Sequence, residues 1–204
     1  MHIWMKSAIG GLWLAVVCAG MGIVLEHQSR PGVAANPAIH WHEDSKIVRP
    51  ADRDFLLVFV HPHCPCSAAT MEELNRLMTR CHGRLAASVL FVKLPNTDSN
   101  WQHTDLWRAA SAIPTVNVQT DDDGVEAARF DAVTSGQTLL YSSDGTLLFR
   151  GGITLGRGHE GDNAGFDAIA DLVAGKEPAV RQTPVFGCEL FDPVTRQQGE
   201  TCKP

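Results

Sequence analysis

The apolar positions of the chain follow two different spacings after residue 51. Continuous apolar runs, typical of strands buried on both faces, alternate with stretches in which apolar residues recur every three or four positions. The runs predict strands at 55–60, 87–94, 115–118, 137–141 and 146–149, and the stretches predict helices at 68–81, 104–113, 125–130 and 163–173. Asp144-Gly145 between the last two strands indicates a hairpin. This order predicts an α/β fold with a mixed sheet flanked by helices.

The N-terminus carries a different pattern. Lys6 precedes an uncharged apolar run from Ala8 to Leu25, about the length of a membrane-spanning helix. We expect residues 1–26 to form an uncleaved signal anchor. A cleaved signal peptide, with processing near Val33-Ala34-Ala35, is the alternative. Either interpretation exports the rest of the chain.

Composition sets the remaining boundaries. Prolines, glycine and polar residues between 27 and 50 predict a linker. Residues 51–176 then form one domain and 177–204 a C-terminal extension, which suits a chain of 204 residues that is 44% hydrophobic. The net charge of -6, without a basic run that contains aromatic residues, gives no reason to expect nucleic-acid binding.

Three stretches of sequence, together with the order of the elements, resemble a known family. They are His61-Pro62-His63-Cys64-Pro65-Cys66-Ser67, Thr134-Ser135-Gly136 and Arg157-Gly158-His159-Glu160-Gly161-Asp162-Asn163-Ala164-Gly165. The chain resembles the thioredoxin-like, exported thiol–disulfide proteins of bacteria, and more narrowly a group named RedB. The resemblance implies a thioredoxin-like fold, a single-pass anchor in the bacterial inner membrane and a domain in the periplasm. It also implies exported protein thiols or disulfides as substrates, and a redox partner in the membrane.

Cys64 and Cys66 lie where a predicted buried strand meets a predicted helix. A thiolate is the attacking species in disulfide exchange, and the N-terminus of a helix stabilises it. By analogy with the family, Cys64 is the attacking cysteine and Cys66 the resolving one. His63, if protonated, would add to the positive field, and Pro65 stiffens the ring that a Cys64–Cys66 disulfide closes.

The spacing departs from the Cys-x-x-Cys of the family by one residue. A disulfide across a single residue closes a smaller ring, and strained disulfides have more oxidising potentials. We therefore expect an oxidant or isomerase more than a strong reductant.

The resemblance also suggests substrate-contacting positions. Ser135-Gly136 occupies the place of the family's cis-proline, and Pro65 and Arg157 complete the expected substrate-binding set. The loop that follows the hairpin is expected beside the cysteines, where His159 would assist proton transfer or provide a metal ligand. A structural loop whose polar residues cap the last helix is the alternative.

Two other functions remain open. His61, His63, Cys64 and Cys66 place two imidazoles and two thiolates within six residues, a set that suits Cu(I) or Zn(II). Thiol–disulfide exchange would need neither metal nor other cofactor. The third interpretation is a membrane-tethered binding module without chemistry.

Three other cysteines, Cys81, Cys188 and Cys202, are expected to have structural roles. Cys188 and Cys202 are predicted to form a structural disulfide in an oxidising compartment. A second redox pair that exchanges with the first is the alternative. Cys81, on the apolar face of a predicted helix, is expected to be a buried, inert thiol.

Overall fold

The computed structural model describes residues 2–191, which fall into two units divided between Arg30 and Pro31. The first unit is helix α1 (His2–Ser29). Its stretch from Ile9 to Ser29 is long and apolar enough to cross a membrane, and none of it is buried. The expected apolar helix is therefore present, and it fits a single-pass anchor and a signal sequence equally well.

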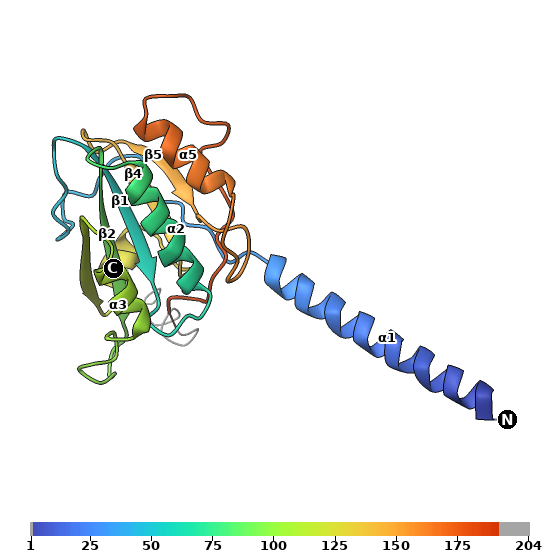
Figure 1. Ribbon diagram of the computed structural model, residues 1–204. Coiled ribbons are helices and arrows are strands. Elements are labelled where there is room, and N and C mark those ends of the chain that lie inside the picture. Colours follow the sequence, from blue (N-terminus) through green and yellow to red (C-terminus); the bar gives the residue numbers. More distant parts are fainter. Residues whose placement is uncertain (1, 192–204) are drawn as a thin grey trace. The chain divides into compact units, whose positions relative to one another are not determined.

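The second unit is built on a five-stranded mixed sheet (Figure 1). The strands are β1 (Asp54–Val60), β2 (Leu85–Lys93), β3 (Val116–Asp122), β4 (Gln137–Tyr141) and β5 (Leu147–Gly151), in the order β3-β2-β1-β4-β5. Strands β1, β2 and β3 are parallel, whereas β4 is antiparallel to both β1 and β5. The helices are α2 (Ser67–Arg80), α3 (Asp105–Ser111), α4 (Val125–Arg129) and α5 (Ala164–Val173). The predicted thioredoxin-like fold is confirmed.

Strand β1 is the centre of the sheet and of both hydrophobic cores. Leu56, Val58 and Val60 face one side, where they pack with buried residues of α2, α3 and α5. Phe55 and the alternate residues after it face the other side, towards α4. Because both faces are covered, β1 is the continuous apolar run that the sequence predicted.

The segment expected as a linker packs against the domain instead. Ala35 is 2% exposed, and its N–H donates to Gln137 Oε1 at 2.8 Å. The Trp41 ring lies 5.1 Å from the ring of Phe130 and 5.2 Å from that of Tyr141. Single side chains spaced irregularly along 31–50 make these contacts, so the composition of the segment did not reveal them.

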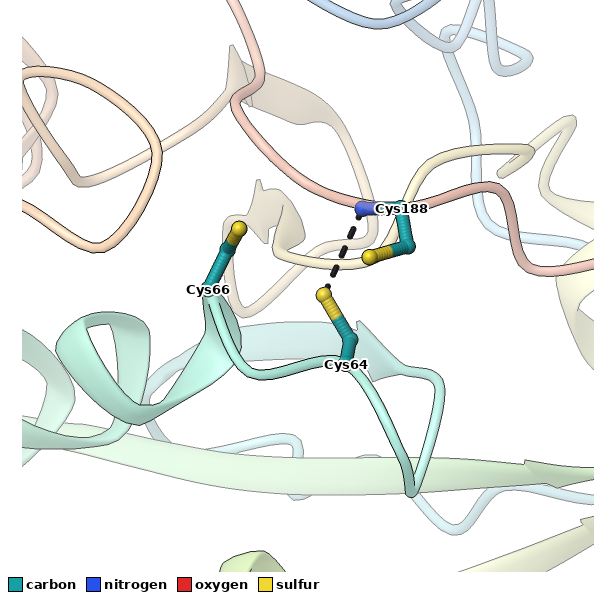
Figure 2. A group of neighbouring side chains, drawn as sticks. All are labelled: Cys64, Cys66 and Cys188. Carbon is teal, nitrogen blue, oxygen red and sulfur yellow. Dashed lines mark hydrogen bonds between the residues drawn. The ribbon is translucent and has the colours of Figure 1, made fainter. Parts of the chain in front are cut away.

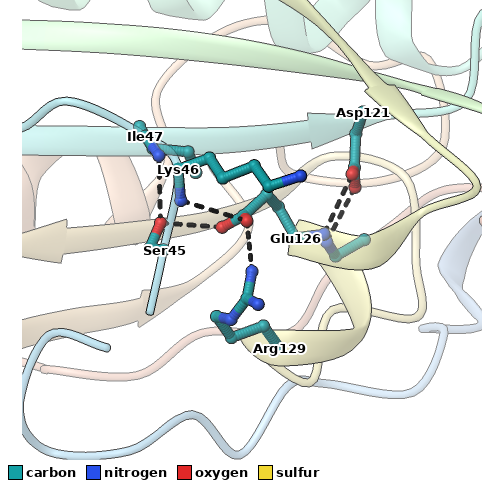
Figure 3. Close-up of polar contacts among 7 residues, drawn as sticks. Ser45, Lys46, Ile47, Asp121, Glu126 and Arg129 are labelled. Carbon is teal, nitrogen blue, oxygen red and sulfur yellow. Dashed lines mark hydrogen bonds and ion pairs between the residues drawn. The ribbon is translucent and has the colours of Figure 1, made fainter. Parts of the chain in front are cut away.

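A polar contact joins the same segment to α4 (Figure 3). Ser45 Oγ donates to Glu126 Oε2 at 2.7 Å, and the N–H of Lys46 donates to Glu126 Oε1 at 3.2 Å. Arg129 forms an ion pair with the same carboxylate. The Asp121 carboxylate accepts the N–H of Glu126 at 2.9 Å, and it holds the start of α4 in place.

The chain after α5 also belongs to the packed domain. Val185 and Leu190 are fully buried, and the N–H of Leu190 donates to the carbonyl of Val133 at 2.9 Å. The boundary expected at residue 176 is therefore not a boundary of the packed unit.

Candidate active site

The cysteine motif lies between β1 and α2, as predicted. The N–H of Cys64 donates to the carbonyl of His61 at 3.0 Å, and the N–H of Ser67 donates to the carbonyl of Cys64 at 3.1 Å, so the chain turns tightly before the helix. Cys66 is the N-cap residue of α2. Both cysteines therefore lie at the N-terminus of α2, where the helix dipole favours a thiolate.

Hydrogen-bond donors converge on Cys64, whose side chain is 0% exposed. The thiol of Cys188 is the strongest of them, and with the hydroxyls of Ser67 and Ser135 and the backbone N–H of Cys188 it holds the pKa of Cys64 well below its usual range. Burial acts in the opposite direction, but the donors outweigh it. The two hydroxyl oxygens lie 2.7 Å apart, and Ser135 Oγ also accepts the N–H of His61 at 2.9 Å.

Cys66 behaves in the opposite way. Burial raises the pKa of this half-buried thiol, and the negative charge on Cys64 raises it further. The guanidinium of Arg157 partly offsets both effects. One sulfur is thus held as a thiolate while its neighbour stays protonated, the asymmetry that an attacking and a resolving cysteine require.

A third cysteine, Cys188, lies beside this pair (Figure 2). The sulfurs of Cys64, Cys66 and Cys188 all lie within 4.8 Å of one another, and the N–H of Cys188 donates to Cys64 Sγ at 3.3 Å. Its predicted disulfide partner, Cys202, lies outside the described residues. The sequence predicts contact between Cys188 and this pair only as an alternative, because a cysteine in the C-terminal extension carries no signal for the segment on which the extension packs.

The two histidines of the motif differ in environment. His63 is exposed, and its ring lies 4.1 Å from the ring of Trp101. His61 is half-buried, and burial lowers its pKa while the negative charge on Cys64 raises it. The charge of Cys64 therefore acts on His61, and the contribution expected of His63 stays a prediction.

The loop between β5 and α5 reaches the site through Arg157. This side chain acts electrostatically on Cys66 and Cys188 and donates to the carbonyl of Gly187. His159 is exposed, and its Nδ1 lies 2.9 Å from the carbonyl of Arg157 in its own loop. The loop is attached to α2 through Glu73, which is buried and accepts the N–H of Gly161 at 2.7 Å. The role assigned to His159 stays a prediction.

The other positions predicted to bind substrate lie near the cysteines, and their role stays a prediction. Gly136 has φ +90°, and its N–H donates to the carbonyl of Phe59 at 2.8 Å, which fixes Ser135 beside the motif. Pro65 is exposed and lines an open groove of about 400 Å³. Cys64, Pro62 and Leu106 lie in the wall of the same groove.

Cys81 is buried as predicted, at 1% exposed, and burial raises the pKa of its thiol. A protonated thiol in a core is a poor nucleophile, which fits the inert role expected of it.

No protein-family model and no curated protein matches the chain. An uncharacterized conserved protein from Geobacillus kaustophilus has a similar structure: it is 20% identical with a TM-score of 0.57, over 81% of this chain and 91% of that chain. A hypothetical protein from Sinorhizobium meliloti is 18% identical with a TM-score of 0.56, over 80% and 96%. A secreted disulfide oxidoreductase from Mycobacterium tuberculosis superposes less well, with 18% identity and a TM-score of 0.44, over 61% and 82%. These likenesses concern the fold, so the function is argued from the residues of this chain.

Proposed function

We propose that the protein is an exported thiol–disulfide oxidoreductase in which Cys64 attacks disulfides and a neighbouring cysteine resolves the mixed disulfide. The observation that carries the proposal is a fully buried cysteine just before α2 whose sulfur accepts the N–H of Cys188 at 3.3 Å; the Cys188 thiol, the hydroxyls of Ser67 and Ser135 and this N–H together lower the pKa of Cys64. A buried structural thiol would not need such donors, since burial alone keeps it protonated. The resulting thiolate is the species that disulfide exchange requires.

The same donors support the oxidising direction. They stabilise the reduced protein, because the thiolate exists only there, and a stabilised reduced form makes a thiol pair a stronger oxidant. Strain in a disulfide across Pro65 acts in the same direction. The proposed substrates are thiols of exported proteins, and α1 fits a membrane anchor that would hold the domain near a redox partner in the membrane.

The test is a redox titration of the full-length chain in detergent. The protein is equilibrated in glutathione buffers, quenched with acid and alkylated, and the state of each cysteine is read by mass spectrometry. We expect Cys64 to be oxidised and reduced reversibly, with a potential more oxidising than that of structural disulfides. Cys81→Ser is the matched control, because this buried thiol lies at the C-terminal end of α2, whereas the cysteine motif lies at its N-terminal end. A Cys64 that stays reduced at every potential would refute the proposal.

Metal binding is the second candidate, and the three neighbouring sulfurs favour it. Cys64, Cys66 and Cys188 offer three soft donors within 4.8 Å, a set that suits Cu(I) and also Zn(II). This donor set differs from the predicted one, because Cys188 takes the place of the two histidines.

Anaerobic reconstitution with Cu(I) or Zn(II), followed by gel filtration and metal analysis, tests this second candidate. Stoichiometric metal that is lost in Cys188→Ser and kept in His63→Ala would support the three-sulfur site. Metal that is lost in His63→Ala and kept in Cys188→Ser would support the site predicted from the motif. Protein that retains no metal would refute both.

A further inference from the structure

The segment that carries Cys188 runs antiparallel to residues 134–135, which precede β4. Residues 187–190, here called the Cys188 segment, form an antiparallel bridge with this stretch at Thr134 and Glu189. The N–H of Ser135 donates to the carbonyl of Cys188 at 2.8 Å, and this bond sets the position of the cysteine along the bridge. Ser135 is also the position at which the sequence predicts substrate contact.

Gly187 makes this close approach feasible. A Cβ atom on Gly187 would lie 1.9 Å from the carbonyl oxygen of Ser135, a distance at which the backbone has to move. The glycine therefore lets the Cys188 segment come close enough for its cysteine to reach the active-site sulfur.

The sulfur of Cys188 consequently lies beside Cys64 Sγ, where a second sulfur has to lie in order to form a disulfide with it. Its backbone N–H contacts Cys64 Sγ, its own sulfur lies within 4.8 Å of it, and the Cys64 side chain is 0% exposed. The chain thus presents one of its own thiols to the attacking cysteine through backbone hydrogen bonds, much as a bound peptide would present a cysteine.

We propose that Cys188 is a third redox cysteine, which resolves mixed disulfides on Cys64 by forming a Cys64–Cys188 disulfide. The inference rests on the proposed function of Cys64. The Cys64 thiolate attacks a disulfide of the oxidising redox partner, whose second sulfur leaves as a thiolate and takes a proton from solvent. Cys188 then attacks Cys64 Sγ, the bond between Cys64 and the partner breaks, and the released partner sulfur takes the proton that Cys188 gives up. The partner gains two electrons and two protons, the Cys64–Cys188 pair loses two electrons, and the new disulfide can then oxidise a pair of substrate thiols.

Ring size favours Cys188 over Cys66 as the resolving cysteine. A Cys64–Cys66 disulfide closes a small ring stiffened by Pro65, whereas Cys188 comes from a separate segment and closes no small ring. A mixed disulfide on Cys64 can therefore be resolved by Cys188 without the strain of the shorter ring.

The experiment follows the fate of a mixed disulfide in the full-length chain. Reduced wild type, Cys66→Ser, Cys188→Ser and Cys202→Ser proteins are mixed in detergent with a disulfide-containing peptide and quenched with acid over time. Disulfides are then mapped by mass spectrometry of proteolytic fragments. Cys18→Ser is the matched control, because this cysteine lies in α1.

We expect Cys66→Ser to form the Cys64–Cys188 disulfide, and Cys188→Ser to accumulate the Cys64–peptide adduct with a lifetime about tenfold longer than in wild type. Gly187→Ala, which keeps all the cysteines but displaces the segment, should also prolong the adduct. The inference is overturned if Cys66→Ser accumulates the adduct, or if Cys188 is found only in a disulfide with Cys202 and Cys202→Ser forms no Cys64–Cys188 disulfide. Absence of a Cys64 adduct from every variant would instead overturn the proposed function, and the inference with it.

Discussion

Replacing Ser67 by alanine tests whether hydrogen bonds set the chemistry of Cys64. Ser67 is 1% exposed, and its hydroxyl is one of the groups that lower the pKa of Cys64. A hydrogen bond to a charged group contributes about 1.5–3 kcal/mol, and a pKa change of one unit corresponds to about 1.4 kcal/mol. Ser67→Ala should therefore raise the pKa of Cys64 by about one to two units.

Losing the hydrogen bond from Ser67 must also change the redox potential, because the thiolate that it stabilises exists only in the reduced protein. For a two-electron couple, about 1.4 kcal/mol corresponds to about 30 mV. At neutral pH the potential of Ser67→Ala should fall by roughly 30–60 mV, which makes the variant a weaker oxidant. The pKa and the potential must therefore change together.

Both quantities can be measured on the same proteins. The pKa follows from the pH dependence of the rate at which Cys64 is alkylated, read from the mass of its peptide, and the potential follows from glutathione equilibration. Ser88→Ala, at a buried serine in β2, controls for the general effect of removing a hydroxyl from the interior. A pKa that rises without a fall in potential, or a variant that changes neither, would refute the electrostatic argument.

Three further outcomes follow from the structure. The pKa of Cys64 is lower in the folded protein than its value near 8.5 in the unfolded chain, so the free energy of unfolding should rise with pH up to about 8.5. The pKa of Cys188 is raised in the folded protein, so the free energy of unfolding should fall above that pH. Urea titrations of the reduced protein should therefore show maximum stability near pH 8.5, and the increase below this pH should be absent from Cys64→Ser. Asn163 caps α5 by accepting the N–H of Phe166 at 2.8 Å, so Asn163→Ala should lower the free energy of unfolding by about 1 kcal/mol, and an unchanged urea midpoint would contradict this role. Gly136→Ala places a Cβ atom on a residue with φ +90°, 3.1 Å from Thr70 Oγ1. We expect this variant to lose more than about 1 kcal/mol of the free energy of unfolding in the same titration, and wild-type stability would show that alanine is not strained at this position.

The regular elements could be predicted from the sequence because their signals are local. Buried runs and helical spacing predicted the strands and helices, with differences at their ends of up to a few residues. Thr115, expected to start the third strand, has φ +65°, so β3 begins at Val116. The hairpin and the cap at Asn163 depend on residues adjacent in sequence, and both are present.

The contacts that attach the 31–50 segment and those that complete the candidate active site could not be predicted in this way, because they join segments far apart in the chain without any repeating pattern. Ala35 bonds to a side chain 102 positions away, and Cys188 bonds to Cys64 across 124 positions. Each of these contacts is made by a single residue, so neither the spacing of apolar residues nor the composition of the segment predicts it. The cysteine motif located Cys64, but the groups that lower the pKa of its thiol come mostly from elsewhere in the chain.

The burial of Cys64 explains why these distant groups matter. Burial disfavours the charged form of Cys64, which is 0% exposed, and among the groups that offset this effect only Ser67 belongs to α2. The hydroxyl of Ser135 and the N–H and thiol of Cys188 provide the remaining stabilisation, and both residues belong to the bridge that holds the Cys188 segment in place. Displacing the segment would therefore expose Cys64 and remove donors from it in the same movement. An oxidising partner that displaces the segment would meet a less stabilised thiolate, and under the proposed mechanism Cys188 restores the buried arrangement once the mixed disulfide has formed.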